Sequence, residues 1–215
     1  MGRANGVNLW SSAEHSLDYL RRADSIPHRG EGEATLLEFI PESPRRILDL
    51  GSGAGRLLGL VKAARPRAEF VALDFSETML DELRKGFRED SSVRVVEHDM
   101  EEALPNLGRF DAVISSFAIH HLRHERKRGI YREIFEALEP GGVFCNLEHV
   151  DSPTDALHRG FLRAIHWEKE DPSNKLLDLQ TQLTWLRETG YQDADCHWKW
   201  RELALLAGSK PGESV

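Results

Sequence analysis

The chain has 215 residues, of which 40% are hydrophobic and 30% are charged, which is enough for one α/β domain but short for two. Its 28 Lys and Arg residues against 36 Asp and Glu residues give a net charge of −8, which excludes a general electrostatic attraction to nucleic acid. No apolar run approaches the roughly 20 residues of a membrane span, and the N-terminus lacks a secretory-signal pattern, so we expect a cytoplasmic protein without a membrane partner.

Short apolar runs alternate with amphipathic segments along most of the chain. The runs have the length of buried strands and are rich in Val, Ile, Leu and Phe, at 46–50, 69–74, 93–98, 110–115 and 143–149. The segments between them carry apolar residues at helical spacing, as in Met79, Leu80, Leu83 and Phe87, with Ser76 expected as the N-cap of that helix. This alternation predicts parallel βαβ units and therefore a doubly wound α/β sheet.

The C-terminal part departs from this alternation. A helix is expected over 154–167 and another over 181–189, ending at Gly190. Two strands then follow at 191–200 and 202–207, and their connection is too short for anything except an antiparallel hairpin. We therefore predict a mostly parallel seven-stranded sheet with an antiparallel C-terminal strand.

The most informative segment is a glycine-rich loop between the first strand and its helix. It reads Asp49-Leu50-Gly51-Ser52-Gly53-Ala54-Gly55-Arg56, and closely spaced glycines let a backbone turn sharply and approach a ligand. A dinucleotide-binding loop would have its third glycine where Arg56 stands, and a P-loop would need Gly-Lys followed by Ser or Thr. The pattern is instead an acidic residue followed by three alternating glycines, which suits a cationic ligand better than a phosphate.

Four further marks follow in order along the chain. They are Asp74 at the end of the second strand, Asp99-Met100 after the third, the segment 110–122 around the fourth, and Leu138-Glu139-Pro140-Gly141-Gly142 before the fifth. With the glycine loop, these marks resemble the class I S-adenosylmethionine-dependent methyltransferases, which implies a Rossmann-like fold and S-adenosylmethionine as the cofactor. The resemblance covers roughly residues 45–150.

The resemblance also implies which residues bind the cofactor. Asp74 is expected at the ribose hydroxyls, Asp99 and Met100 at the adenine, and Arg29 at the methionine carboxylate. The full expected set is Arg29, Asp49, Gly51, Ser52, Gly53, Gly55, Asp74, Phe75, Met79, Asp99, Met100, Ser115, Ser116 and Phe117.

Histidines follow the fourth and fifth strands, at the carboxyl edge where such sheets bind ligands. If the methyl acceptor is a hydroxyl or an amine, a general base assists, and histidine is the usual choice. We expect His121 in this role, with Glu148 or His149 as its partner, and keep His120 and His149 as further catalytic candidates. The alternative is that these histidines are merely packed polar residues, and their spacing matches no closed zinc pattern, so no metal is expected.

The expected domain organisation is simple. Residues 1–30 should form an N-terminal lid, residues 31–215 a single cofactor-binding domain, and residues 151–178 a helical insertion near the acceptor. A chain of this size without a fused recognition module favours a small-molecule acceptor with an O, N or S nucleophile, and a monomer or homodimer. The alternatives are a transfer-RNA-modifying methyltransferase using the basic run 123–132, a non-catalytic cofactor-binding subunit, and, less favoured, an NAD-dependent oxidoreductase.

Overall fold

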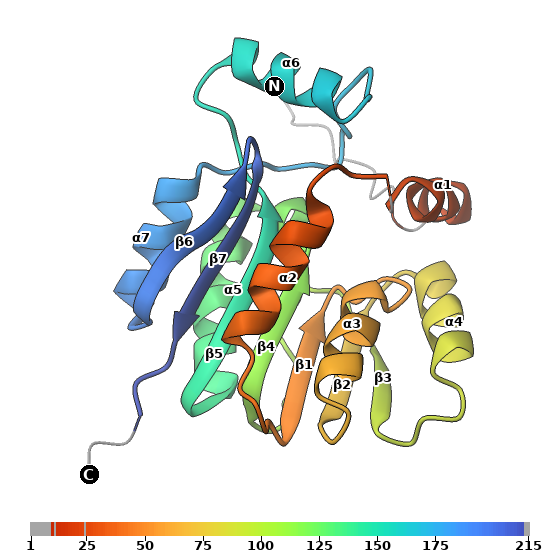
Figure 1. The fold of residues 1–215 in the computed structure, drawn as a ribbon, viewed down its shortest axis with the longest axis vertical. Helices are drawn as coiled ribbons and strands as arrows, with labels where there is room; N and C mark the ends of the chain where they lie inside the picture. Colours follow the sequence, from red (N-terminus) through yellow and green to blue (C-terminus); the bar gives the residue numbers. More distant parts are fainter. Residues whose placement is uncertain (1–9, 11, 24, 213–215) are drawn as a thin grey trace.

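A seven-stranded sheet forms the centre of the molecule in the computed structural model, which describes residues 10, 12–23 and 25–212 (Figure 1). The strands lie in the order β3-β2-β1-β4-β5-β7-β6. Their bounds are β1 (Arg46–Leu50), β2 (Glu69–Asp74), β3 (Val93–Glu97), β4 (Phe110–Ser116), β5 (Leu138–His149), β6 (Gln192–Trp200) and β7 (Leu203–Ser209). The first five strands pair in parallel, as their continuous apolar runs predict.

The C-terminal hairpin completes the sheet. Strand β7 pairs antiparallel with β5, from Val143 opposite Ser209 to His149 opposite Leu203, and antiparallel with β6 on its other side. The predicted fold class is therefore confirmed. The antiparallel strand lies inside the sheet, and β6, which follows the direction of the parallel strands, forms the edge.

Helices cover both faces of the sheet. Helices α2 (Arg29–Phe39), α3 (Arg56–Ala64) and α4 (Glu77–Gly86) lie on one face, and α5 (His124–Ala137) and α7 (Leu179–Thr189) lie on the other (Figure 1). Neighbouring residues of a strand point to opposite faces, so Ile47 packs in the core beneath α2 and α3, while Leu48 packs in the core beneath α5 and α7. The two apolar clusters fix the orientation of every strand end that surrounds the site.

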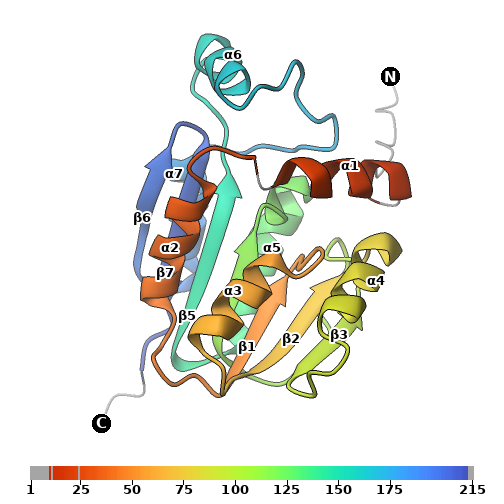
Figure 2. The ribbon, with the colours of Figure 1, turned by 45° about the vertical axis from the view of Figure 1, so that its right-hand side comes forward.

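Two helices and a 3-10 turn lie beyond the carboxyl ends of the strands. They are α1 (Ala13–Ala23), α6 (Asp155–Ala164) and η2 (Ile119–His121), and Figure 2 shows α1 and α6 above the sheet. Helix α1 packs against α4, where Ser16 Oγ and Ser76 Oγ are 3.2 Å apart. Ser76 holds the N-cap position of α4, but its hydroxyl makes no capping bond. Helix α6 begins at the predicted point, where Thr154 Oγ1 accepts from Leu157 N, but it ends three residues earlier than expected.

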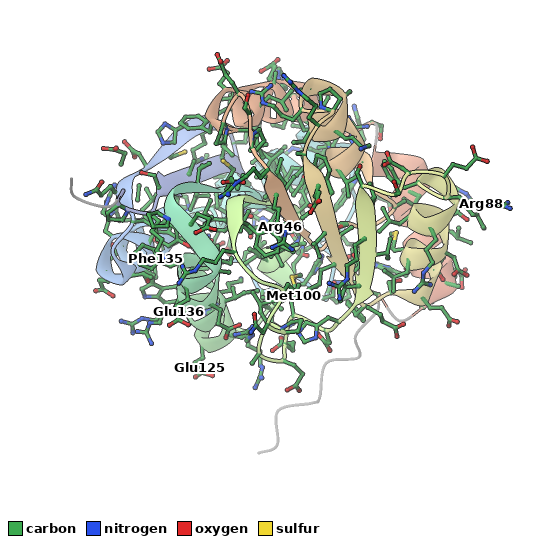
Figure 3. All side chains as sticks on the ribbon, turned by 90° about the horizontal axis from the view of Figure 1, so that it is seen from below. Arg46, Arg88, Met100, Glu125, Phe135 and Glu136 are labelled. Atoms are coloured by element: carbon green, nitrogen blue, oxygen red, sulfur yellow. The ribbon has the colours of Figure 1, made fainter. Side chains whose placement is uncertain are left out.

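The opposite edge of the sheet, where the parallel strands begin, includes Arg46 at the start of β1. Figure 3 views this edge from below, and Arg46 lies near its middle, where its guanidinium donates to the carbonyls of Leu107 and Arg109 and stacks over Phe110. None of the helices in the described part of the chain combines the length and the apolar character that a membrane crossing requires.

Candidate functional site

A cavity of about 520 Å³ opens at the carboxyl ends of β1, β2 and β4. The chain order reverses between β1 and β4, and such switch points are where open α/β sheets bind ligands. The volume suits a drug-sized molecule. Twelve of the fourteen predicted cofactor residues line it: Arg29, Asp49, Gly51, Ser52, Gly53, Asp74, Phe75, Met79, Asp99, Met100, Ser116 and Phe117.

The other two predicted residues lie behind the cavity wall. Gly55 has φ +87°, and a Cβ on it would come within 2.5 Å of Leu83 and 2.7 Å of Phe87, so this glycine lets the loop pack on α4. Ser115 is fully buried and its hydroxyl donates to the Leu50 carbonyl at 2.8 Å, which ties β4 to β1. Both residues support the cavity from outside it.

The other two glycines of the loop, Gly51 and Gly53, are required for different structural reasons. Both have positive φ, +66° at Gly51 and +54° at Gly53, where side chains other than hydrogen are strained. A Cβ on Gly51 would lie 2.2 Å from the Ala118 Cβ, a clash within the protein. A Cβ on Gly53 would meet only Met79 Sδ, at 3.9 Å. Since Gly53 lines the cavity, its missing side chain leaves space for a ligand.

Asp74 holds the loop in place from the end of β2. Its Oδ2 accepts from Gly53 N at 2.8 Å, and its Oδ1 accepts from Phe75 N and Ser76 N at 2.8 and 2.9 Å. Burial raises the pKa of this carboxyl, although the three backbone donors oppose that shift. A carboxylate has about four lone-pair sites, so Asp74 keeps acceptor capacity on the cavity side.

Asp49 is an unsatisfied buried carboxylate. It is 1% exposed, and neither side-chain oxygen has a hydrogen-bond partner among the residues that the structure describes. Burial raises the pKa of Asp49 to about 7, with a smaller contribution from the charge of Asp74 and against the opposing effect of the nearby Ser52 hydroxyl. A cation placed in the cavity would stabilise the ionised form, because an opposite charge nearby offsets the cost of desolvation. The site is therefore suited to a positively charged ligand.

A second unsatisfied group and a strained residue follow β4. The hydroxyl of Ser116 is buried and has no hydrogen-bond partner within residues 10, 12–23 and 25–212. Phe117 has φ +51°, a backbone conformation that is uncommon outside glycine and concentrates at functional sites. The Arg29 guanidinium stacks over the Phe117 ring at 5.1 Å. Arg29 is itself held by Glu33, whose Oε1 accepts from Arg29 Nε and from Arg56 Nε, both at 2.8 Å. The positive charge of Arg29 is thereby fixed at the cavity wall.

The three candidate histidines lie together just after β4 and at the end of β5. His121 lines the large cavity and also a smaller one of about 40 Å³, and His120 and His149 line only the smaller one. The rings of His120 and His121 are 4.0 Å apart, and those of His120 and His149 are 5.6 Å apart. Burial lowers the pKa of His120 and of His121 well below the usual value, so both rings are neutral near pH 7.

The predicted partners of His121 were wrong. Glu148 Oε1 contacts His120 Nδ1 at 2.7 Å, and His149 Nε2 contacts Glu202 Oε2 at 2.9 Å. His121 Nδ1 instead contacts Ser173 Oγ at 3.1 Å. The fully buried Glu148 lies on β5, where alternate side chains point to opposite faces, and the turn η2 brings His120 rather than His121 to it.

Several cavity residues were not foreseen individually. Trp10 and Leu20 come from the N-terminal segment, and Pro172, Ser173 and Lys175 come from the connection between α6 and α7. Trp10 packs edge-on against His121 with 5.1 Å between ring centres. The connection has no hydrophobic period, so nothing in the sequence indicated which of its residues would reach the cavity.

Comparisons with known proteins agree with this geometry. Residues 47–142 match the family model described as "Methyltransferase domain". A demethylmenaquinone methyltransferase from Clavibacter sepedonicus is 34% identical over 128 residues, which cover 60% of this chain and 51% of that protein. A carboxy-S-adenosyl-L-methionine synthase from Helicobacter hepaticus is 23% identical over 218 residues, 90% of each chain. The chain spans between 51% and 59% of the length of three demethylmenaquinone methyltransferases that it matches.

Solved structures share the fold across nearly the whole chain. The N-methyltransferase NodS from Bradyrhizobium japonicum, in complex with S-adenosyl-L-homocysteine, matches with a TM-score of 0.71 at 16% identity, covering 95% of this chain and 99% of that one. This structural similarity supports the fold. The family match and the ordered motifs support S-adenosylmethionine as the cofactor. The family match over residues 47–142, together with the fold and the ordered motifs, supports a class I S-adenosylmethionine-dependent methyltransferase.

Proposed function

We propose that this protein transfers a methyl group from S-adenosylmethionine to a small-molecule acceptor with an O, N or S nucleophile. One observation carries the proposal: a single cavity joins the family's cofactor motifs, on one side, to His121 on the other. Bound there, S-adenosylmethionine supplies an electrophilic methyl group on a cationic sulfur. The residues of the cavity would then hold the donor, orient the acceptor and exclude water.

The cofactor fits the residues present. The buried, unpartnered Asp49 carboxylate suits the cationic groups of the cofactor, and Asp74 has lone pairs left for the ribose hydroxyls. Arg29 would hold the methionine carboxylate by charge-assisted hydrogen bonds. Asp99 and Met100 would hold the adenine. The space beside Gly53, which a side chain would fill, is where the backbone would approach the ligand most closely.

The acceptor would lie between His121 and the two covering segments. Trp10 and Leu20 from residues 1–30 and Pro172 and Ser173 from residues 151–178 line the same cavity, and we propose that these segments act as a lid and an acceptor-binding insertion. His121 would remove the proton of a hydroxyl or amine acceptor. Its lowered pKa keeps the ring neutral, which is the state a base requires.

The basic run 123–132 gives little support to an RNA acceptor. Arg123 pairs with Glu101, Arg126 with Glu133 and Arg128 with Glu188. Lys127 is 1% exposed. Side chains paired with acids or buried offer few cations to phosphates, whose neutralisation dominates nucleic-acid affinity.

A labelled-methyl assay tests the proposed function. The protein is incubated with S-adenosylmethionine carrying a labelled methyl group and with cell extract divided into low-molecular-weight, RNA and protein fractions. We expect a labelled low-molecular-weight product that separates from S-adenosylmethionine by chromatography, and no such product with the Gly53→Val variant. Label recovered in RNA would favour the transfer-RNA alternative. Tight binding of S-adenosylhomocysteine without a labelled product in any fraction would indicate a cofactor-binding subunit.

A further inference from the structure

The segment that joins α6 to α7, residues 165–178 and here called the strap, is fastened across the turn that carries His121. Lys175 N donates to the His120 carbonyl at 3.0 Å, and Lys175 Nζ contacts the His121 carbonyl. The buried Lys127 of α5 contacts the Lys175 carbonyl. His124 Nε2 lies 3.1 Å from the Leu176 carbonyl. Contacts on both sides of the turn therefore fix the strap relative to the His121 ring.

Two polar side chains of the strap, Ser173 and Asp171, form a series of contacts that begins at the His121 ring. Ser173 is 8% exposed, and its Oγ lies 3.1 Å from His121 Nδ1 and 2.7 Å from Asp171 Oδ1. Asp171 Oδ1 also accepts from Ser173 N at 2.8 Å, which closes a tight turn around the carboxylate. The series His121–Ser173–Asp171 thus runs from the cavity wall into the strap.

The directions of these hydrogen bonds follow from counting protons. An ionised carboxylate only accepts, so the single hydroxyl proton of Ser173 points to Asp171. Ser173 Oγ can then only accept from His121, which requires a proton on Nδ1. Among the described residues, Nδ1 is the one ring nitrogen of His121 that makes a hydrogen bond. In the neutral ring, Nε2 therefore carries the lone pair.

We propose that Ser173 and Asp171 are positioning residues that hold His121 in the Nδ1–H tautomer and so assign the role of base to Nε2. The inference deepens the proposed function, because it rests on His121 being the base. The acceptor proton would move to Nε2, the Nδ1 proton would stay on the ring, and the Asp171 carboxylate would balance the imidazolium charge through the Ser173 hydroxyl. The proton on Nε2 would afterwards be released to solvent.

The charges around His121 are consistent with this arrangement. His120 on the same turn disfavours the charged ring, while Asp171 on the strap and Glu148 on β5 favour it. Lys175 lies on the strap, and Lys127 lies behind the turn on α5. Burial outweighs these charges and keeps the resting ring neutral. Asp171 would thus matter most once the ring has taken up a proton.

Asp171 also contacts the N-terminal lid, which supplies a control. Its Oδ2 lies 3.3 Å from His15 Nε2 on α1, at the opposite oxygen from the one that accepts from Ser173. A His15→Ala variant removes the lid contact and leaves the series His121–Ser173–Asp171 intact. Comparing His15→Ala with Ser173→Ala therefore separates the effect of losing the contact with α1 from the effect of losing the tautomer preference.

The tautomer can be read directly without substrate. Long-range proton–nitrogen correlation spectra of protein labelled with ¹⁵N-histidine distinguish protonated from unprotonated ring nitrogens, and His121→Asn assigns the His121 signals. We expect Nδ1–H in the wild type, in Ser173→Thr and in His15→Ala, and loss of that preference in Ser173→Ala. A wild-type ring protonated on Nε2 overturns the proposal, as does an unchanged spectrum in Ser173→Ala.

Steady-state kinetics, with the acceptor that the labelled-methyl assay identifies, then test the effect of the tautomer on turnover. Ser173→Ala should lower kcat roughly 10- to 100-fold with little change in KM, less than the roughly 10²–10⁴-fold contribution of the base itself, and Ser173→Thr should recover most of the loss. In a His121→Ala background, Ser173→Ala should cause no further loss, because the two residues act as one unit. Asp171→Asn should move the acid limb of the kcat profile to lower pH, since Asp171 raises the pKa of His121. If the losses from Ser173→Ala and His121→Ala add up in the double variant, the positioning role of Ser173 is overturned and His121 can still be the base. Wild-type turnover in His121→Ala would overturn the assignment of His121 as the base.

Discussion

The side chain of Asp74 and the backbone of Gly53 are joined by a 2.8 Å hydrogen bond that links the end of β2 to the glycine loop. The two residues are 21 positions apart, and the parallel pairing of β1 with β2 brings them together. One carboxylate thereby shapes the loop and offers its remaining lone pairs to the cavity. If Asp74 binds the ribose as proposed, loop geometry and cofactor binding depend on the same group.

Removal of the Asp74 carboxylate should weaken cofactor binding. Asp74→Ala should lower S-adenosylhomocysteine affinity by about 1.5–3 kcal/mol, the range for hydrogen bonds to a charged group, and Asp74→Asn should lose less because one oxygen remains. Isothermal titration calorimetry measures both. The matched control is Asp178→Ala, which removes the capping carboxylate of α7 outside the cavity and should cost about 1 kcal/mol of stability with unchanged affinity. Unchanged affinity in a folded Asp74→Ala protein would refute the ribose assignment.

Gly53 should tolerate a side chain structurally but not functionally. Gly53→Ala places a Cβ in the cavity with only an ordinary contact to Met79 Sδ among the described residues, so its cost in stability should be the roughly 1–3 kcal/mol of positive-φ strain. Gly141→Ala is the matched control, because Gly141 has φ +80° and open space around it, away from the cavity. Both variants should lose similar stability in denaturant titrations, and only Gly53→Ala should lose S-adenosylhomocysteine binding. Equal cofactor affinity in the two variants would contradict the close approach of the loop to the cofactor.

Asp49 should make cofactor binding depend on pH. Its pKa of about 7 means that the ionised form, which attracts a cation, accumulates only as pH rises towards neutrality. Wild-type affinity for S-adenosylmethionine should therefore increase by up to about tenfold per pH unit between pH 5 and 7 and then level off. Asp49→Asn should bind more weakly at pH 8 and should lack this slope. Parallel profiles for the two proteins would show that Asp49 does not face the cationic groups.

The same carboxyl should affect stability with the opposite sign. The folded pKa lies above the unfolded value of 3.8, so between about pH 4 and pH 7 the folded state holds one more proton. The stability of the protein without cofactor should therefore fall as pH rises through that window. The difference in unfolding free energy between Asp49→Asn and wild type should grow in favour of the variant over the same range, by up to roughly 4 kcal/mol for a shift of about three units. A constant difference would mean that Asp49 titrates normally.

His121→Ala should impair turnover and spare binding. If His121 is the base, kcat should fall roughly 10²–10⁴-fold while cofactor affinity stays nearly the same, because a base acts mainly in the transition state. The lowered pKa of His121 places the acid limb of the wild-type profile below pH 6.5, so activity should persist into mildly acidic buffer. His197→Ala, an exposed histidine on β6, serves as the control for loss of an imidazole. Wild-type turnover and pH profile in His121→Ala would point to an acceptor that needs no base.

The sheet was predictable because buried parallel strands appear in the sequence as continuous apolar runs. For four of the five predicted parallel strands, the first and last residues agree with the structure to within one position. Strand β5 is the exception, since it begins at Leu138 rather than Val143, across a Pro-Gly-Gly stretch that signals a turn. Most of the predicted site residues that line the cavity lie at or just after the carboxyl ends of strands, where the sequence pattern could place them. Ser173 and Asp171 were not predictable, because only tertiary packing brings the strap to His121.

The cavity is bounded by two kinds of structural element, strand ends and covering segments. Its cofactor side rests on strand ends that are also part of the core, so changes there endanger the fold. Its other side, where we propose that the acceptor binds, includes Trp10, Leu20 and Pro172, which belong to neither of the two apolar clusters. If the acceptor binds there as proposed, substitutions at these three positions should alter acceptor choice at small cost in stability. A lineage with this architecture can change its chemistry of recognition while the donor half stays fixed, and libraries aimed at new acceptors should be confined to those positions.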